Sequence, residues 1–258
     1  MFNQLIKYRD LLFMLAMRDI RVRYKQAIMG LAWAIFMPIM AILAGIIVKQ
    51  AIAFISGRPL DLSEVISITV KVLPWTFFVS AIKFSVNSLV QNSSLITKIY
   101  FPREVLPFGA VLACLFDFLI AICTLSLMLA IARIGLSIHI LLIPFLLLFL
   151  ILFTTGLSLI LSAANLFYRD VKYIVETILM FGIFFTPVFY SVSTFGKWKT
   201  LMLLNPIASI LESINSTVVL HQMPDILWFS YAGLSSILIF ALGIRFFRRL
   251  EPQFAERI

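Results

Sequence analysis

The amino-acid sequence predicts an all-α membrane protein with six transmembrane helices, and three observations support this fold class. The 258 residues are 62% hydrophobic and only 13% charged, whereas a soluble domain carries about a quarter charged residues. The apolar residues gather in runs close to the roughly 20 residues needed to cross a bilayer. Most of the charged residues lie between these runs, so they mark the ends of the spans. We therefore expect one transmembrane domain over residues 1–258.

The first element is a predicted amphipathic helix over residues 1–25. Its apolar residues alternate with Lys and Arg, and its apolar runs are too short to span a bilayer. A soluble helix on a protein face is the alternative interpretation. A helix on the cytoplasmic membrane surface fits better, because the next segment enters the bilayer directly. No cleavable signal peptide is evident in this region.

Uncharged or nearly uncharged runs then predict the six spans. We place these helices at 30–48, 72–91, 108–132, 140–163, 174–192 and 226–244. The apolar stretch after the fifth helix is broken by Pro187, Gly196, Pro206 and Pro224. Short re-entrant or interfacial helices are expected there, because irregular backbone at membrane depth must be buried in protein or line a wet cavity.

The distribution of Lys and Arg predicts the orientation. If the N-terminus is inside, the inner segments hold more than twice as many Lys and Arg residues as the outer segments. The positive-inside rule then places both termini in the cytoplasm and the short helices on the periplasmic side. The same rule accounts for the net charge of +9, so nucleic acid is not an expected partner.

Enzyme chemistry is poorly supported. No segment matches the phosphate-binding GxxxxGK[ST] pattern, and no HExxH, CxxC or His/carboxylate cluster occurs. We expect no catalytic residues, no metal site and no cofactor in this chain. If ATP drives the protein, the ATPase that holds ATP and Mg²⁺ is a separate polypeptide.

Two charged residues, Lys83 and Asp117, lie inside predicted spans. Each is nine residues from the cytoplasmic end of its helix, so both lie roughly 13–14 Å deep. Equal depth on consecutive antiparallel helices permits an ion pair, and intramembrane charges are commonly paired or functional. Pore lining, snorkelling and packing at another interface are the alternatives.

The segment 92–108 between the second and third spans is more apolar than an ordinary loop. Its apolar side chains need a partner surface, either a soluble subunit or the protein's own helices. Aromatic residues gather after the start of the fifth helix, as either an interfacial belt with packing or a lined conduit. The composition does not choose between these readings.

Four segments together resemble the permease subunits of ABC-2 polysaccharide exporters, with the O-antigen permeases as the nearest likeness. These are RDIRVRYKQAIMGLAWAIFMP (18–38), LITKIYFPREVLP (95–107), LFYRDVKYIVE (166–176), and FFTPVFYS (184–191) with NPI (205–207). The resemblance implies a homodimer with two copies of a separate ATPase. It also implies a glycan linked to undecaprenyl diphosphate, exported across the bacterial inner membrane to the periplasm.

The resemblance further implies roles for particular residues. Contacts that couple the permease to the ATPase are expected at Leu95, Ile96, Lys98, Tyr100, Phe101, Pro102, Arg103, Glu104, Tyr168, Arg169 and Asp170. Aromatic side chains along the conduit are expected at Trp33, Phe36, Phe181, Phe184, Phe185, Phe189 and Tyr190. Electrostatics, and not the resemblance, leads us to expect a cationic entrance for the lipid diphosphate at Arg18, Arg21, Arg23 and Lys25, although anchoring by the positive-inside rule explains the same charges.

Three other functions stay open. An ABC-2 exporter of a small hydrophobic drug or lipid would share the fold but would not need a wide aromatic conduit. An ion-coupled secondary transporter or channel would act without an ATPase, through Lys83 or Asp117. A membrane enzyme would need site chemistry that the sequence lacks.

Overall fold

The computed structural model describes residues 7–25, 28–55, 57, 61–131, 135 and 137–254. Within these ranges the chain is helical and contains no β-strand. Five helices are long and apolar enough to cross a membrane. They are α3 (Trp33–Ile55), α4 (Leu62–Gln91), α6 (Val105–Ile131), α7 (Ile143–Phe167) and α11 (Ile226–Leu250). The all-α class and five of the predicted spans therefore have long helices in their places.

Shorter helices connect and cap the bundle. They are α2 (Arg9–Tyr24), α5 (Ser93–Lys98), α8 (Val171–Phe185), α9 (Lys199–Leu203) and α10 (Pro206–Val218). Short 3₁₀ turns precede α3 and α7, cover Val192–Trp198, and follow α11. The short helices α9 and α10 occupy the stretch for which the prolines predicted interrupted structure.

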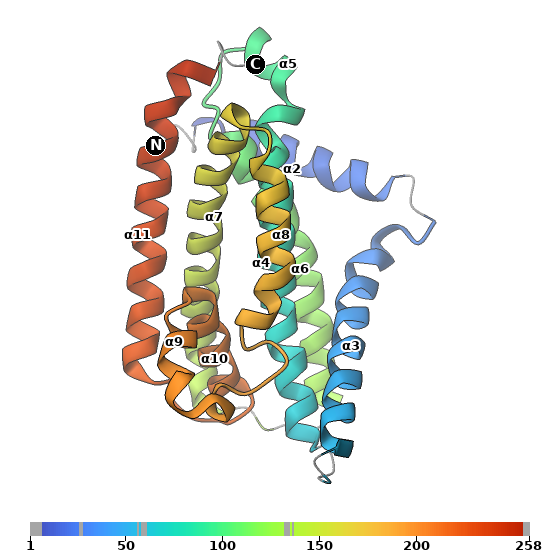
Figure 1. Cartoon of the computed structure of the whole chain (residues 1–258). Helices are drawn as coiled ribbons and strands as arrows, with labels where there is room; N and C mark the ends of the chain where they lie inside the picture. Colours follow the sequence, from blue (N-terminus) through green and yellow to red (C-terminus); the bar gives the residue numbers. More distant parts are fainter. Residues whose placement is uncertain are drawn as a thin grey trace.

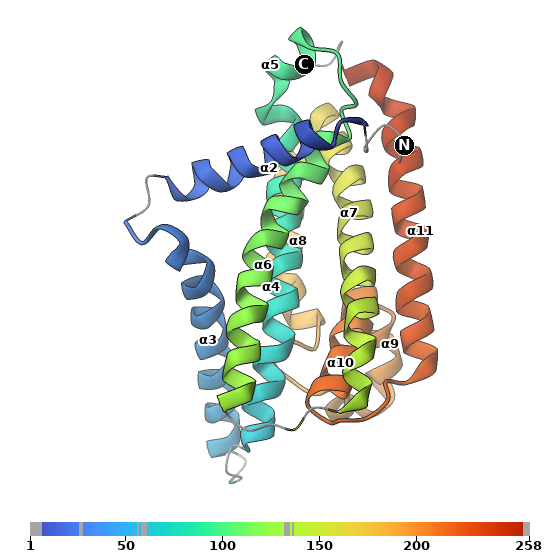
Figure 2. The same cartoon turned by 180° about the vertical axis from the view of Figure 1, so that it is seen from behind.

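The long helices form an upright bundle with two distinct ends (Figure 1). One end, which we call the α5 end, carries α5, the α7–α8 connection and α2 (Figure 1). The other, the α10 end, carries α9 and α10 (Figure 1). Helix α2 crosses the bundle and packs on α6, whereas α10 packs among α4, α7 and α11 (Figures 1 and 2).

Helices α7 and α11 are held together by backbone contact. A Cβ atom built on Gly243 would lie 2.3 Å from the carbonyl oxygen of Gly156, and one built on Gly156 would lie 2.6 Å from that of Ile239. Only glycine permits this approach, as is common where helices pack in membranes. The two helices therefore pack backbone against backbone at this point.

Burial differs sharply between the spans. In the most apolar 18-residue window of each helix, 67% of the residues are buried for α4 but only 6% for α3. Helix α4 is thus the centre of the bundle. Helix α3 stands at its edge (Figure 1) and leaves large apolar side chains uncovered, among them Met37, Met40 and Ile47.

Two predicted boundaries differ from the structure because polar side chains find partners. The second span was placed at 72–91, but α4 begins at Leu62. The added turns carry Glu64, which pairs with Lys49 of α3 at 2.8 Å, and Lys71, which pairs with Glu212 of α10. The charges of Glu64 and Lys71 suggested that the span begins after them. Because both charges are paired in the structure, α4 can include these residues.

The fifth predicted span, 174–192, is also different in the structure. Helix α8 runs only from Val171 to Phe185, which is about 22 Å at 1.5 Å per residue. Pro187 lacks an amide hydrogen and restricts the residue before it, Thr186, to an extended backbone, as observed there. Helix α8 alone is therefore shorter than the roughly 30 Å hydrocarbon core.

Candidate functional site

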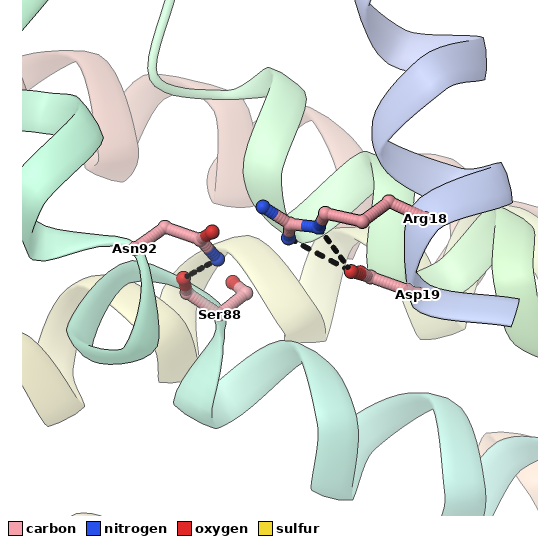
Figure 3. Close-up of polar contacts among 4 residues, drawn as sticks. All are labelled: Arg18, Asp19, Ser88 and Asn92. Carbon is pink, nitrogen blue, oxygen red and sulfur yellow. Dashed lines mark hydrogen bonds and ion pairs between the residues drawn. The ribbon is translucent and has the colours of Figure 1, made fainter. Parts of the chain in front are cut away.

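The segment between α4 and α6 is a short helix followed by bends and a turn, where the sequence suggested a loop. At its start, the buried Asn92 donates a hydrogen bond from Nδ2 to the carbonyl oxygen of Ser88 at 2.7 Å (Figure 3). This bond uses a carbonyl group that the end of α4 would otherwise leave without a partner. The chain then turns directly into α5, which fixes the direction of the segment.

This segment has a buried face and an exposed face. Ile96 and Phe101 are buried in a cluster with Leu89 and Leu166, and Leu95 packs against it. Ile99 and Tyr100 are 58% and 95% exposed, and Lys98 is exposed as well. The buried side chains anchor the segment, while the exposed ones project from the α5 end.

Arg103 and Glu104 make contacts within the subunit, and their coupling to an ATPase stays a prediction. Glu104 is 2% exposed and pairs with Arg248 at 2.8 Å. The Arg103 amide donates to Glu251 Oε1 at 3.2 Å, and its guanidinium donates to the Glu251 carbonyl oxygen. Both residues therefore bind the C-terminal end of α11.

The residues after α11 complete this contact. Phe254 is fully buried and its ring lies 5.2 Å from that of Phe247 and 6.0 Å from that of Phe167. It also lies beneath the guanidinium of Arg103. Sequence reasoning missed Arg248, Glu251 and Phe254, although the opposite charges of 103–104 and 248–251 were the available signal.

The connection between α7 and α8 lies at the same end and is exposed. Tyr168 is 74% exposed, and Arg169 and Asp170 are exposed beside it. The buried Asn165 holds this connection, because its Nδ2 donates to the Val86 carbonyl at 3.0 Å and its Oδ1 accepts from the Lys172 amide at 3.2 Å. Tyr100 and Tyr168 thus project from the same end of the bundle.

The four predicted entrance cations are in different environments. Arg18 bonds Asp19 on its own helix through Nε and Nη2, at 3.0 and 2.8 Å (Figure 3). Arg21 and Lys25 are exposed. Arg23 points inward and pairs with Asp117 of α6, so its charge is already neutralised.

The predicted pair of Lys83 and Asp117 is absent from the structure. Both oxygens of Asp117 are occupied by α2, one by Arg23 and the other by the hydroxyl of Tyr24. Lys83 is exposed and has no carboxylate within 4.0 Å among the described residues. The depth argument considered only neighbouring spans, whereas the Arg23 and Tyr24 side chains at the end of α2 also reach Asp117.

The predicted aromatic residues divide into two groups. Trp33 and Phe189 line a cavity of about 620 Å³ between α3, α4 and α6, and Phe36 packs edge-on against Trp33 at 5.4 Å. Phe181, Phe184 and Phe185 instead are more than half exposed on α8. Tyr190 bonds the Phe184 carbonyl oxygen through its hydroxyl at 2.8 Å.

A second buried charge was missed by sequence reasoning. Lys71 is 2% exposed, donates to the Tyr190 carbonyl at 3.0 Å, and pairs with Glu212 at 3.6 Å. It was assigned to the loop before the second span, although its position ten residues after Asp61 would have allowed a longer helix. No group of three or more metal-ligating residues occurs in the part of the chain that the structure describes.

The helical bundle and its long apolar helices define a multi-pass membrane protein. Residues 10–219 match the family model for the ABC-2 type transporter, and the chain belongs to that family. Permease subunits of this kind carry no ATPase domain, in agreement with the missing phosphate-binding motif.

Curated relatives are similar over nearly the whole chain. An O-antigen export system permease protein, RfbA of Myxococcus xanthus, is 30% identical over 99% of this chain and 98% of its own length. Two proteins of the same name from Klebsiella pneumoniae are 27% and 26% identical, each over 96% of this chain and 94% of the relative.

Proposed function

We propose that this chain is the membrane subunit of an ATP-driven exporter that moves an O-antigen-like polysaccharide, linked to undecaprenyl diphosphate, from the cytoplasm to the periplasm. One observation carries this proposal: the likeness to O-antigen export permeases extends over 94–98% of the relatives' length as well as over this chain. The protein resides in the bacterial inner membrane. Its α5 end and both termini face the cytoplasm.

The chain crosses the membrane six times in this proposal. Five passes are the long helices. The sixth is α8 together with the extended stretch 186–191, with α9 and α10 as the short helices on the periplasmic side. The burial of α10 supports this assignment, because nine of its residues from Ile207 to Thr217 are buried against the bundle.

A second copy of the chain completes the channel. This is supported by the apolar faces of α3 and α8, which stay exposed among the residues that the structure describes. On α8 the exposed side chains include Ile178, Met180 and Phe184. Phe181, Phe184 and Phe185 then lie at or beside the conduit between the two subunits, where ring faces suit the apolar C–H faces of sugars.

Two copies of a separate ATPase dock at the α5 end and hold ATP and Mg²⁺. Tyr100, Ile99 and Tyr168 support this, since exposed apolar side chains on a membrane subunit need a partner surface. When ATP draws the ATPases together, their rigid-body motion passes to the bundle through these contacts. Arg21 and Lys25 stay available to attract the lipid diphosphate, with Arg18 beside them.

The test is reconstitution of the chain with its ATPase in proteoliposomes. We expect copurification, ATP hydrolysis stimulated by lipid-linked glycan, and glycan movement that needs ATP. The chain without the ATPase is the control and should move nothing. Glycan or ion flux through the chain alone would exclude the proposal in favour of a channel or secondary transporter. Movement of a small hydrophobic drug without any effect of glycan would support a different ABC-2 substrate.

A further inference from the structure

Three polar side chains from two elements meet beside the cavity that α3, α4 and α6 enclose. Arg23 and Tyr24 are at the end of α2, and Asp117 is in the middle of α6. The hydroxyl of Tyr24 donates to Asp117 Oδ1 at 2.7 Å, and Arg23 Nη1 pairs with Asp117 Oδ2. Both carboxylate oxygens of Asp117 are therefore bound by α2.

The surroundings of this cluster make the contact costly to break. The guanidinium of Arg23 lies 4.0 Å above the ring of Phe84, and its Nη2 is 3.7 Å from Cys114 Sγ. Much of the cavity wall is aromatic or aliphatic. The side chains of Arg23 and Asp117 are only 20% and 21% exposed, so a single unpaired charge is unfavourable there.

Tyr24 keeps its role as a donor over a wide pH range. Burial and the hydrogen bond to Asp117 both raise the pKa of Tyr24 well above its ordinary value. The phenol therefore stays protonated at physiological pH. Asp117 is consequently held by one neutral donor and one cation.

Helix α2 is attached to α6 at a second point. Leu12, Leu15 and Ala16 lie within 4 Å of the space where a Cβ on Gly109 would stand. Gly109 precedes Asp117 by eight residues, or about 12 Å along α6. The two attachments, separated by this distance, join α2 to α6 at its middle and at its end.

We propose that Arg23, Tyr24 and Asp117 form a transmission latch, by which a displacement of α2 at the membrane surface becomes a displacement of α6. We treat them as positioning residues, because in this proposal they act through α6. The inference rests on the proposed function, in which an ATPase acts on this end of the protein. In this proposal Arg23 joins α2 to α6, a role separate from its expected place in the lipid-diphosphate entrance.

The latch predicts uncoupling when it is opened. In the reconstituted complex with its ATPase, we expect Asp117→Asn and Arg23→Gln to lower ATP-dependent glycan export at least tenfold while ATP hydrolysis falls less than twofold. The double exchange Arg23→Asp with Asp117→Arg should restore export to within about threefold of the wild type, because opposite charges again face each other. Tyr24→Phe removes one hydrogen bond without a charge and should give an intermediate loss.

The matched control is Arg9→Gln on the same helix, where Arg9 pairs with Asp10 and both side chains are over three-quarters exposed. It should export like the wild type. Parallel loss of export and hydrolysis, unchanged export in Asp117→Asn, or a double exchange no better than the single variants would overturn the latch. A wild-type complex that hydrolyses ATP but exports no glycan would overturn the proposed function. The latch, which rests on that function, would then fail as well.

Discussion

Lys71 is an almost fully buried cation within a membrane-spanning helix. Its ammonium group pairs with Glu212 of α10 and donates to the Tyr190 carbonyl oxygen in the stretch after α8. One side chain of α4 thus holds two of the connections at the α10 end. Glu212 Oε2 is buried without a hydrogen bond, so Lys71 supplies its main compensation.

At this scale we predict that Lys71→Met destabilises the protein by about 3–5 kcal/mol, the usual cost of leaving one partner of a buried pair uncompensated. The loss should appear as a lower midpoint in thermal unfolding of the detergent-solubilised protein. Replacing both partners, Lys71→Met with Glu212→Leu, should recover part of the loss because no charge is then stranded. Lys83→Met, at an exposed position, is the control and should shift the midpoint little. An equal midpoint for Lys71→Met and Lys83→Met would contradict the assigned role.

Elements differ in how firmly they are joined. Helices α7 and α11 touch through Gly156 and Gly243, and the end of α11 is bound to the α5–α6 segment through Glu104 and Arg248. The α5–α6 segment is therefore joined to α11, and through α11 to α7, by direct contacts within the subunit. Helices α3 and α8, in contrast, each leave an apolar face exposed that is available to pack against another copy.

The element-scale prediction concerns this glycine contact. Gly156→Val would place side-chain atoms against the backbone of Ile239 and Phe240, where a Cβ alone would approach to 2.6 Å. Since backbone cannot move aside cheaply, we expect a loss of at least about 1–3 kcal/mol, the range for overpacking, and a lower thermal midpoint. Gly135→Val is the matched control, because nothing lies within 4 Å of a Cβ there. Equal stability of the two variants would mean that α7 and α11 are not in direct contact.

At the scale of the whole molecule, the α5 end and the sides of the bundle expose different kinds of surface. At the α5 end, Tyr100 and Tyr168 project outward from two connections that buried residues hold in place. Exposed tyrosines on a rigid support are typical anchors of protein interfaces. The sides of the bundle, formed by α3 and α8, are apolar and suit lipid or a second copy.

At this scale we predict that Tyr100→Ala with Tyr168→Ala weakens binding of the ATPase about 100-fold or more, since each buried anchor contributes about 2 kcal/mol or more and 1.4 kcal/mol is tenfold in affinity. Copurification and titration of the detergent-solubilised permease with its ATPase would measure this. Trp198→Ala is the control, as Trp198 is 67% exposed but lies at the α10 end. If Trp198→Ala weakened the complex as much as the double variant, the docking end would be assigned wrongly.

The sequence by itself determined the class of protein. A lipid environment requires long apolar segments with few charges, whatever the contacts between the helices, so composition and hydropathy reveal it. Five spans and the interrupted stretch before the last helix followed from this reasoning, and the family followed from motifs in order along the chain. The exact helix ends did not follow. Charged residues at Glu64 and Lys71 resembled a loop until their partners were known.

Only the tertiary structure decided which charges meet. The sequence suggested Lys83 as the ion-pair partner of Asp117, because the two residues have the same predicted depth. In the structure, Arg23 and Tyr24 bind that carboxylate instead. Likewise, Arg103 and Glu104 bind the end of α11, almost 150 residues away along the chain, a contact that the sequence spacing did not predict. An ion pair depends on distance and direction in space, which helix packing sets and which no spacing along the chain records.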